Sequence, residues 1–163
     1  MRIYTLKREQ VLPISLENAW EFFSTPLNLN EITPDDLKFE ILTKGLEGEK
    51  MYPGMIINYK VSPFAGIKFR WTTEISQVKT QEYFVDEQRF GPYAFWHHKH
   101  FFEEVEGGVK IIDIVDYGLP FGFLGKIAHA LFVKGKLKHI FDFRHEILAK
   151  EFGVEASKDT TIY

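Results

Sequence analysis

The 163-residue sequence contains no cysteine, which excludes disulfides, thiolate nucleophiles, iron–sulfur clusters and zinc sites built on cysteine. No apolar run approaches the ~20 residues that a membrane-spanning helix needs, so we expect no membrane span. The first residues also lack the ~7–15-residue apolar stretch of a signal peptide, and we therefore expect a cytoplasmic protein. Positive charge is not in excess either, since the net charge is −3, and we expect no nucleic-acid partner.

Aromatic side chains are abundant instead, at 16% of the residues, with sixteen phenylalanines. Such flat apolar side chains line ligand pockets as well as cores. The length fits a single domain with its own core. We expect that domain to span residues 1–152, because the hydrophobic pattern is lost after it, and residues 153–163 to form a flexible tail.

A two-residue hydrophobic period, which is typical of strands, governs most of the first 119 residues. It begins at Ile3 and stops at Pro13. Ser15, a preferred N-cap residue, predicts a short helix that ends near Pro26, and a second helical turn is expected over 27–32. Six further strands are expected, joined by turns that contain glycine or proline. They span residues 37–43, 54–62, 67–79, 82–90, 93–105 and 109–118.

Past Pro120 the hydrophobic period becomes 3.6, which predicts one amphipathic helix of about seven turns. Gly135 lies in its middle. Because glycine destabilises a helix interior by ~1 kcal/mol relative to alanine, we expect a bend there or a place where a bound group needs room. The apolar stripe of this helix consists of Leu124, Ile127, Ala128, Leu131, Phe132, Leu137, Ile140, Phe141, Ile147 and Leu148.

One strand, two short helices, six antiparallel strands and a long helix predict an α+β architecture of the helix-grip type. In this fold a curved, seven-stranded antiparallel sheet wraps around the C-terminal helix. One helix is too narrow to fill a deeply curved sheet, so a cavity is expected between them. A set of spaced residues accompanies this order of elements. It comprises Phe84, Asp86, Gln88, Gly91-Pro92, Trp96, His98, His100, Phe102, Gly107-Gly108, Asp113, Val115, Tyr117 and Leu119-Pro120-Phe121-Gly122.

The element order and these residues resemble the START-related superfamily (SRPBCC), which includes lipid-transfer proteins, polyketide cyclases and the birch pollen allergen. The similarity is greatest to small bacterial stand-alone members, and it covers residues 1–150. The resemblance implies the helix-grip fold and a ligand cavity. It does not fix the chemistry, because members of this kind are described as ligand-binding proteins, as cyclases and as cell division inhibitors.

Histidines at alternate positions mark the strand expected at 93–105. Side chains two apart on a strand share a face, so His98 and His100 point one way while Lys99 and Glu103 point the other. The charged pair prefers water, which places the two histidines on the concave face. A hairpin at residues 106–109 then sets the partners on the next strand, and a different loop length of the same parity would only slide the pairing. The predicted partners are Phe102 with Asp113, His100 with Val115, and His98 with Tyr117.

Polar side chains on the concave face need partners, because an unpaired buried polar group costs ~1–3 kcal/mol. They can form a metal site, in which His98, His100 and Asp113 supply three ligands. They can also form an acid–base site, with His98 or His100 as the catalytic group and Asp113 as its orienting partner. We favour a polar network that orients a bound molecule, with no metal and no cofactor. The polar set comprises Asp86, Gln88, His98, His100, Asp113 and Tyr117.

The leading functional hypothesis is the binding of a small, mostly apolar ligand, of aromatic, lipid-like or polyketide-like character, between sheet and helix. One alternative is an enzyme of the cyclase, aromatase or hydrolase kind that uses the His–Asp pair in the same cavity. The other, which the resemblance implies, is an interaction protein that affects cell division through its surface. The residues expected to contact the ligand are Trp71, Phe84, Asp86, Gln88, Trp96, His98, His100, Phe102, Asp113, Val115, Tyr117, Phe121, Leu131, Phe132 and Gly135.

The C-terminal helix also carries a local excess of positive charge. Between residues 126 and 150, six basic residues face two acidic ones, a balance of +4. The usual interpretation of such a pattern is the solvated face of an amphipathic helix, and a docking surface is the alternative. The basic residues are Lys126, Lys134, Lys136, Lys138, Arg144 and Lys150.

Overall fold

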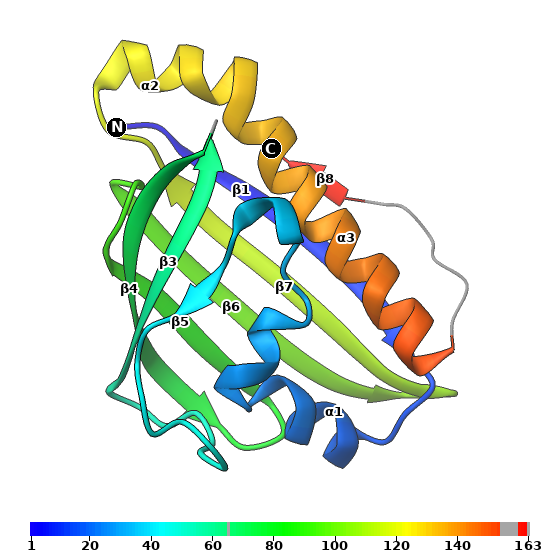
Figure 1. The fold of residues 1–163 in the computed structure, drawn as a ribbon. Coiled ribbons are helices and arrows are strands. Elements are labelled where there is room, and N and C mark those ends of the chain that lie inside the picture. Colours follow the sequence, from blue (N-terminus) through cyan, green and yellow to red (C-terminus); the bar gives the residue numbers. More distant parts are fainter. Residues whose placement is uncertain (65, 154–159, 163) are drawn as a thin grey trace.

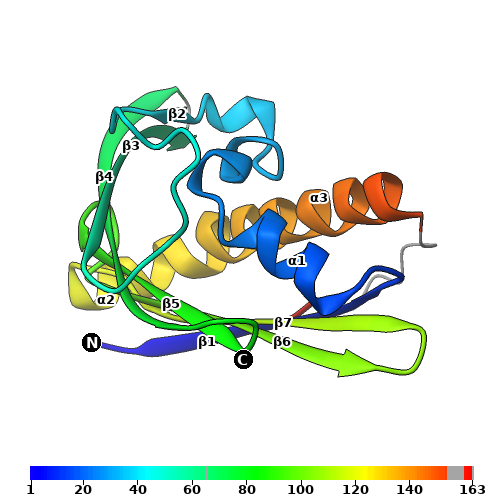
Figure 2. The same cartoon turned by 90° about the horizontal axis from the view of Figure 1, so that it is seen from below.

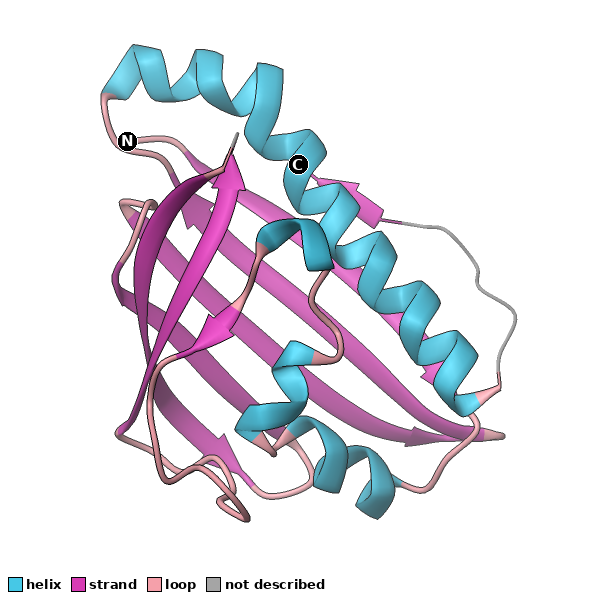
Figure 3. Cartoon of the chain, in the orientation of Figure 1, coloured by secondary structure: helices cyan, strands magenta, loops and turns pink. Residues whose placement is uncertain are grey.

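A computed structural model describes residues 1–64, 66–153 and 160–162 of the chain, which form one antiparallel sheet with helices on its concave side (Figure 1, Figure 3). The strands are β1 (Ile3–Leu12), β2 (Glu40–Ile41), β3 (Met55–Phe64), β4 (Ile67–Lys79), β5 (Tyr83–Phe90), β6 (Phe95–Val105), β7 (Gly108–Gly118) and β8 (Thr160–Ile162). The helical segments are α1 (Leu16–Phe23), the 3-10 turns η1 (Pro26–Asn30) and η2 (Asp35–Leu37), α2 (Gly122–Ala128), the π-helical turn η3 (His129–Val133) and α3 (Lys134–Phe152).

The sheet confirms the helix-grip architecture, with strands in the order β2-β3-β4-β5-β6-β7-β1-β8. All the long strands begin and end within two residues of the expected positions. The strand expected at 37–43 is shorter, because η2 occupies its start and Lys38 then adopts the left-handed conformation (φ 47°), which no strand residue can keep. Figure 2 shows that the sheet bends, so that β3 and β4 stand steeply over the plane of β1, β6 and β7.

Alternation along β1 shows why these residues form a two-sided strand. Tyr4, Leu6 and Leu12 are buried on the concave side, while the residues at odd-numbered positions from 3 to 11 are exposed or half-buried. Arg8 and Gln10 also point inward and are buried, so the concave face is not purely apolar. A period of two can therefore assign side chains to a face even where the face is polar.

Helix α1 closes one end of the bent sheet. The Ser15 hydroxyl accepts a hydrogen bond from the backbone N–H of Asn18 at 3.1 Å, which confirms the predicted N-cap. Trp20 packs edge-on against Phe84 and Phe102, with ring centroids 6.2 and 5.5 Å apart. The helix thus anchors the segment that continues through η1 and η2 over the sheet (Figure 2).

The C-terminal helical segment differs from the expected single helix. It consists of α2, the π-helical turn η3 and α3, and α3 runs along the inside of the bend (Figure 2). A π-helical turn carries an extra residue, which shifts the phase of the apolar stripe. Leu137, Phe141 and Leu148 of α3 are therefore buried, whereas Leu124 and Leu131, which the stripe prediction placed on the same face, are 68% and 66% exposed.

The tail expected after residue 152 falls mostly on 154–159 and 163, which lie outside the described residues. Gly153 ends α3 in the left-handed conformation, with φ 88°. Residues 160–162 differ from the expectation of a loose chain, because they form β8 and pair with Leu6–Arg8 of β1. This pairing covers part of a strand edge that β1 would otherwise present.

Among the residues that the structure describes, the buried apolar side chains fall into three clusters. One cluster gathers around α1, another lies between β1, β7 and α3, and a further one lies on β3 and β4. Members of all three, among them Phe84, Phe141 and Ile75, line one internal space. The core is therefore arranged around a cavity.

Candidate functional site

The cavity lies between the concave face of the sheet, α3 and the segment from α1 to η2. Its volume is about 160 Å³. Its wall is mainly aromatic and aliphatic, and apolar surface that is left without packing partners lowers the stability of a folded protein. Side chains that line it from the helical segments include Phe22, Phe23, Leu29, Ile32, Leu37, Lys136, Leu137, Ile140, Phe141 and Arg144. Those that line it from the sheet include Tyr59, Val61, Trp71, Thr73, Ile75, Phe84, Asp86, Trp96, His98 and His100.

An aromatic trio forms one side of the wall. Trp71 of β4 meets Trp96 of β6 edge-on at 5.1 Å and Tyr93 at 5.5 Å, and the last two rings are 4.9 Å apart. The Trp71 indole donates a hydrogen bond to Thr73 at 3.0 Å. Edge-to-face packing fixes these rings, so the trio presents a preformed apolar surface to the cavity.

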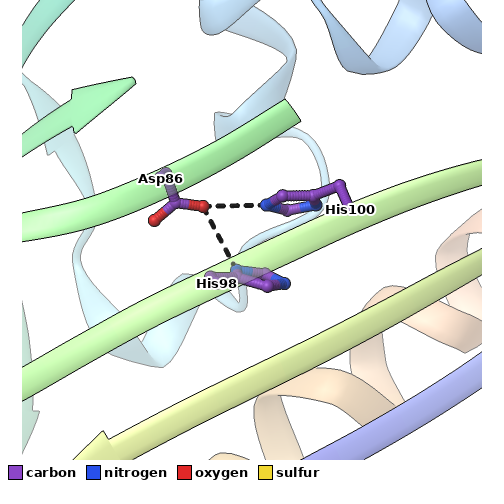
Figure 4. Close-up of side chains that lie close together, drawn as sticks. All are labelled: Asp86, His98 and His100. Atoms are coloured by element: carbon purple, nitrogen blue, oxygen red, sulfur yellow. Dashed lines mark hydrogen bonds and ion pairs between the residues drawn. The ribbon is translucent and has the colours of Figure 1, made fainter. Parts of the chain in front are cut away.

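Two histidines and two aspartates from three adjacent strands form a closed set on the inner face. The register pairs His98 with Asp86 of β5 and His100 with Asp113 of β7. Because side chains two apart on β6 share a face, both imidazoles lie between the two carboxylates. Figure 4 shows the Asp86 carboxylate directed toward both rings. We call these four residues the His–Asp box.

Each imidazole of the box contacts both carboxylates. His98 places Nε2 2.7 Å from Oδ1 of Asp113 and Nδ1 3.3 Å from Oδ2 of Asp86. His100 places Nε2 2.8 Å from Oδ2 of Asp86 and Nδ1 3.1 Å from Oδ1 of Asp113. The Arg144 guanidinium of α3 lies 3.6 Å from the same Asp113 oxygen. The box therefore links three strands to the helix that crosses them.

Electrostatics in the box favour charged groups despite their burial. Burial raises the pKa of Asp86, but the imidazoles of His98 and His100 more than offset it and hold this pKa well below its usual range. The pKa of Asp113 is likewise lowered, because the same imidazoles and Arg144 outweigh burial. Burial lowers the pKa of His98, yet the two carboxylates raise it above its ordinary value. The protonated imidazole of His98 and the two ionised carboxylates thus stabilise one another within the box.

Six of the residues expected to contact a ligand do line the cavity. Within the box, Asp113 lies behind the others, facing a separate small pocket beside Arg8 and His145. Gln88 points elsewhere and pairs with the backbone of Tyr93, donating at 2.7 Å and accepting at 3.2 Å. The six lining residues are Trp71, Phe84, Asp86, Trp96, His98 and His100.

Three further residues on the predicted inner face lie within the packed core and not in the cavity wall. Phe102 packs against Trp20, and Val115 and Tyr117 are fully buried below the wall. The Tyr117 hydroxyl makes a hydrogen bond of 2.9 Å with Nε2 of His129 in η3.

The pairing of β6 with β7 is shifted by two residues from the expected one, so Val115 lies opposite His98 and Asp113 lies opposite His100. The predicted face is confirmed and the predicted partners are wrong.

The four remaining residues that were expected to contact the ligand, Phe121, Leu131, Phe132 and Gly135, do not line the cavity. Phe121, Leu131 and Phe132 are 81%, 66% and 63% exposed. Gly135 is also exposed, and a side chain in its place would meet only open space. The bend expected at this glycine occurs at η3, because the π-helical turn there alters the helix direction (Figure 1).

Some wall residues are not among those predicted. The sequence places Arg144 with the surface charges, although it follows Leu137 by seven residues and therefore shares the inner face of α3. Lys136 also lines the cavity, and its ammonium pairs with the exposed Asp36. Tyr59 lies on the inner face of β3, and its burial follows from the two-residue period. The sequence spacing of Arg144 and Tyr59 therefore indicates that both side chains face the cavity. For Arg144 its positive charge led to the prediction of a surface position instead.

Comparisons with known proteins support the fold. No protein-family model and no curated protein matches the sequence. Protein CV1439 from Chromobacterium violaceum is 15% identical with a TM-score of 0.68, over 93% of this chain and 99% of that one. TTHA0849 from Thermus thermophilus is 13% identical with a TM-score of 0.67, over 91% and 96%. Ara h 8.0201 is 20% identical with a TM-score of 0.57, over 91% and 99%.

These likenesses show the helix-grip fold that the sequence predicts. Among the helices that the structure describes, none has both the length and the apolar character needed to cross a membrane.

Proposed function

We propose, from a fold that fits the START-related superfamily, that the chain binds a small, mostly apolar molecule in the cavity between the sheet and α3. The observation that carries this proposal is the cavity of about 160 Å³ with its aromatic wall and polar floor. An unfilled space between apolar side chains lowers the stability of the fold. The presence of such a space therefore favours a function in ligand binding.

The size and lining of the cavity define the ligand class. An engineered apolar cavity of about 150 Å³ holds a benzene molecule, so one or two rings are accommodated here. The rings of Trp71 and Trp96 provide the apolar contact, and Asp86, His98 and His100 form the polar part of the wall. We propose an aromatic or polyketide-like molecule with one polar group directed at the box, bound in the cytoplasm.

Native mass spectrometry of the protein purified directly from cells tests this proposal. We expect a noncovalent mass increment that is lost on denaturation. A titration with an apolar naphthalene dye provides the second measurement, in which Trp71→Ala weakens binding at least tenfold. Phe90→Ala is the matched control, because Phe90 is an aromatic strand residue with 73% exposure. No increment together with equal dye affinity of the wild type and both variants would overturn the proposal.

A second candidate function is acid–base catalysis on the bound molecule. The observation that favours it is the 2.7 Å contact between His98 and Asp113, with His98 facing the cavity. Catalysis predicts that His98→Gln lowers turnover of the molecule by orders of magnitude while binding is kept. A carrier predicts only a modest change in affinity.

The basic helix gives less support to the interaction-protein alternative. Lys136 pairs with Asp36, and Lys138 pairs with Asp142 at 2.5 Å, so these two charges are already partnered. Under this alternative, Lys138→Glu would abolish partner binding and leave ligand binding unchanged.

A further inference from the structure

We infer that Asp86, His98 and His100 form a binding site for one divalent transition-metal ion, with Asp113 as the outer carboxylate that orients both imidazoles. The inference goes beyond organic-ligand binding, because the ion is held by the chain itself. It also departs from the expectation of no metal. The metal hypothesis from sequence assigned Asp113 as the third ligand, and the structure brings Asp86 of β5 to the cavity side of both rings instead.

Two of the three distances among the ligand atoms are those of neighbouring ligands around one ion. Oδ2 of Asp86 is 3.3 Å from Nδ1 of His98 and 2.8 Å from Nε2 of His100, and all three atoms lie within 4.8 Å of one another. With metal–ligand bonds of about 2.1 Å, two ligands are about 3.0 Å apart at 90° and about 3.4 Å apart at the tetrahedral angle. The two contacts to Asp86 therefore match the spacing of neighbouring ligands around one ion (Figure 4).

The second nitrogen of each ring is already engaged on the far side. Nε2 of His98 and Nδ1 of His100 lie 2.7 and 3.1 Å from the same oxygen of Asp113. A neutral imidazole that donates its N–H to this carboxylate has its lone pair on the opposite nitrogen, which is the one beside Asp86. A carboxylate behind each histidine is the arrangement that fixes the tautomer and orientation of metal-binding imidazoles. Asp113 does this for both rings at once.

The metal-side carboxylate is held in place as well. The Trp96 indole donates to Oδ1 of Asp86 at 3.3 Å, which leaves Oδ2 directed at the histidines. Metal binding displaces the protons that the imidazoles share with Asp86. The two carboxylates (−2) and Arg144 (+1) then give the site a net charge of −1. A dication is therefore attracted, and nitrogen with carboxylate ligands suits Zn²⁺ and Fe²⁺.

Access separates the inner ligands from the outer carboxylate. Asp86, His98 and His100 line the cavity, whereas Asp113 lines the small pocket behind them. An ion held by three protein ligands keeps at least one coordination position open, and here that position faces the cavity. A water molecule or the polar atom of a bound organic molecule would occupy it.

The experiment titrates chelator-treated native protein with Zn²⁺ by calorimetry and with Co²⁺ by visible absorption. We expect one ion per chain and a Co²⁺ spectrum with nitrogen and oxygen ligation. Asp86→Asn and His100→Gln should weaken affinity at least 100-fold, and Asp113→Asn about 10–100-fold, as is typical for an outer-shell carboxylate. Circular dichroism and thermal unfolding of each variant report whether it folds.

His97→Gln is the matched control. His97 lies on the same strand but on the other face, and its Nδ1 is 3.1 Å from Glu87, so it repeats the His–carboxylate contact outside the cavity. We expect its affinity to change less than threefold. If the wild-type protein binds no stoichiometric ion, or if His97→Gln weakens binding as much as His100→Gln does, the inference is wrong. Binding of the naphthalene dye by metal-free protein is scored separately, so failure of the metal site leaves the cavity proposal intact.

Discussion

Replacing Ile75 with phenylalanine should stabilise the protein and weaken ligand binding at the same time. Ile75 lies on β4, is 1% exposed and lines the cavity. The coefficient of about 24 cal/mol per Å³ for closed, dry cavities sets an upper bound of about 4 kcal/mol of unfolding free energy on the cost of the 160 Å³ present here. Phenylalanine is larger than isoleucine by about 25 Å³, so the substitution recovers about 0.6 kcal/mol, which corresponds to a rise of about 1–2 °C in Tm.

The assay combines urea unfolding with dye titration. We expect Ile75→Phe to shift the urea midpoint upward and to raise the Kd of the dye at least tenfold, which is about 1.4 kcal/mol of binding free energy. Ile56→Phe is the control, because it makes the same chemical change at a residue that is 44% exposed on β3. If Ile75→Phe lowers stability by more than about 1 kcal/mol, or if the dye binds it as tightly as the control, the space is not an available binding cavity.

Two further predictions concern the packing of the helices on the sheet. Tyr117→Phe leaves Nε2 of His129 buried without its 2.9 Å partner, so the unfolding free energy should fall by about 1–3 kcal/mol in urea titrations, and an unchanged midpoint would refute the role of this bond. The pKa values of His129 and His145 lie below their ordinary 6.5, mainly because burial disfavours the imidazolium. The unfolded chain then binds protons first, so the stability these groups contribute is complete above pH 6.5 and is lost as the pH falls toward their folded-state pKa. The drop in urea midpoint from about pH 7 to about pH 5 should shrink in a His129→Asn/His145→Asn variant, and an equal drop would contradict this assignment.

Much of the sheet was predictable from the two-residue hydrophobic period. This period identifies the segment as a strand and also indicates which face of the sheet each side chain occupies. The inner position of His98 and His100 follows from Lys99 between them, which needs water. The partners across the hairpin were not predictable, since the turn actually used pairs Val105 with Gly108 and shifts every pair by two residues. A shift by two residues keeps each side chain on the same face of the sheet, but it changes the residue that lies opposite on the neighbouring strand.

The helical part was predicted less well, for a physical reason. Periodicity assumes a uniform helix, and η3 interrupts it, so positions before and after residue 133 do not share one face. Charge alone assigns Arg144 to the surface, whereas Asp113 beneath it makes burial possible. Asp86 could be placed beside both histidines only once the turn at Gly91-Pro92 had fixed the parity of β5 against β6.

The π-helical turn also makes the rotational phase of α2 depend on chain length. Successive residues of a helix are rotated by about 100° about its axis, so removing a single residue from His129–Val133 would turn α2 by about that angle relative to α3. Such a deletion would change which side chains of Phe123, Leu124 and Ile127, now 73%, 68% and 42% exposed, face the solvent. The insertion or deletion of one residue in this segment would therefore change how much apolar surface this end of the molecule exposes to solvent.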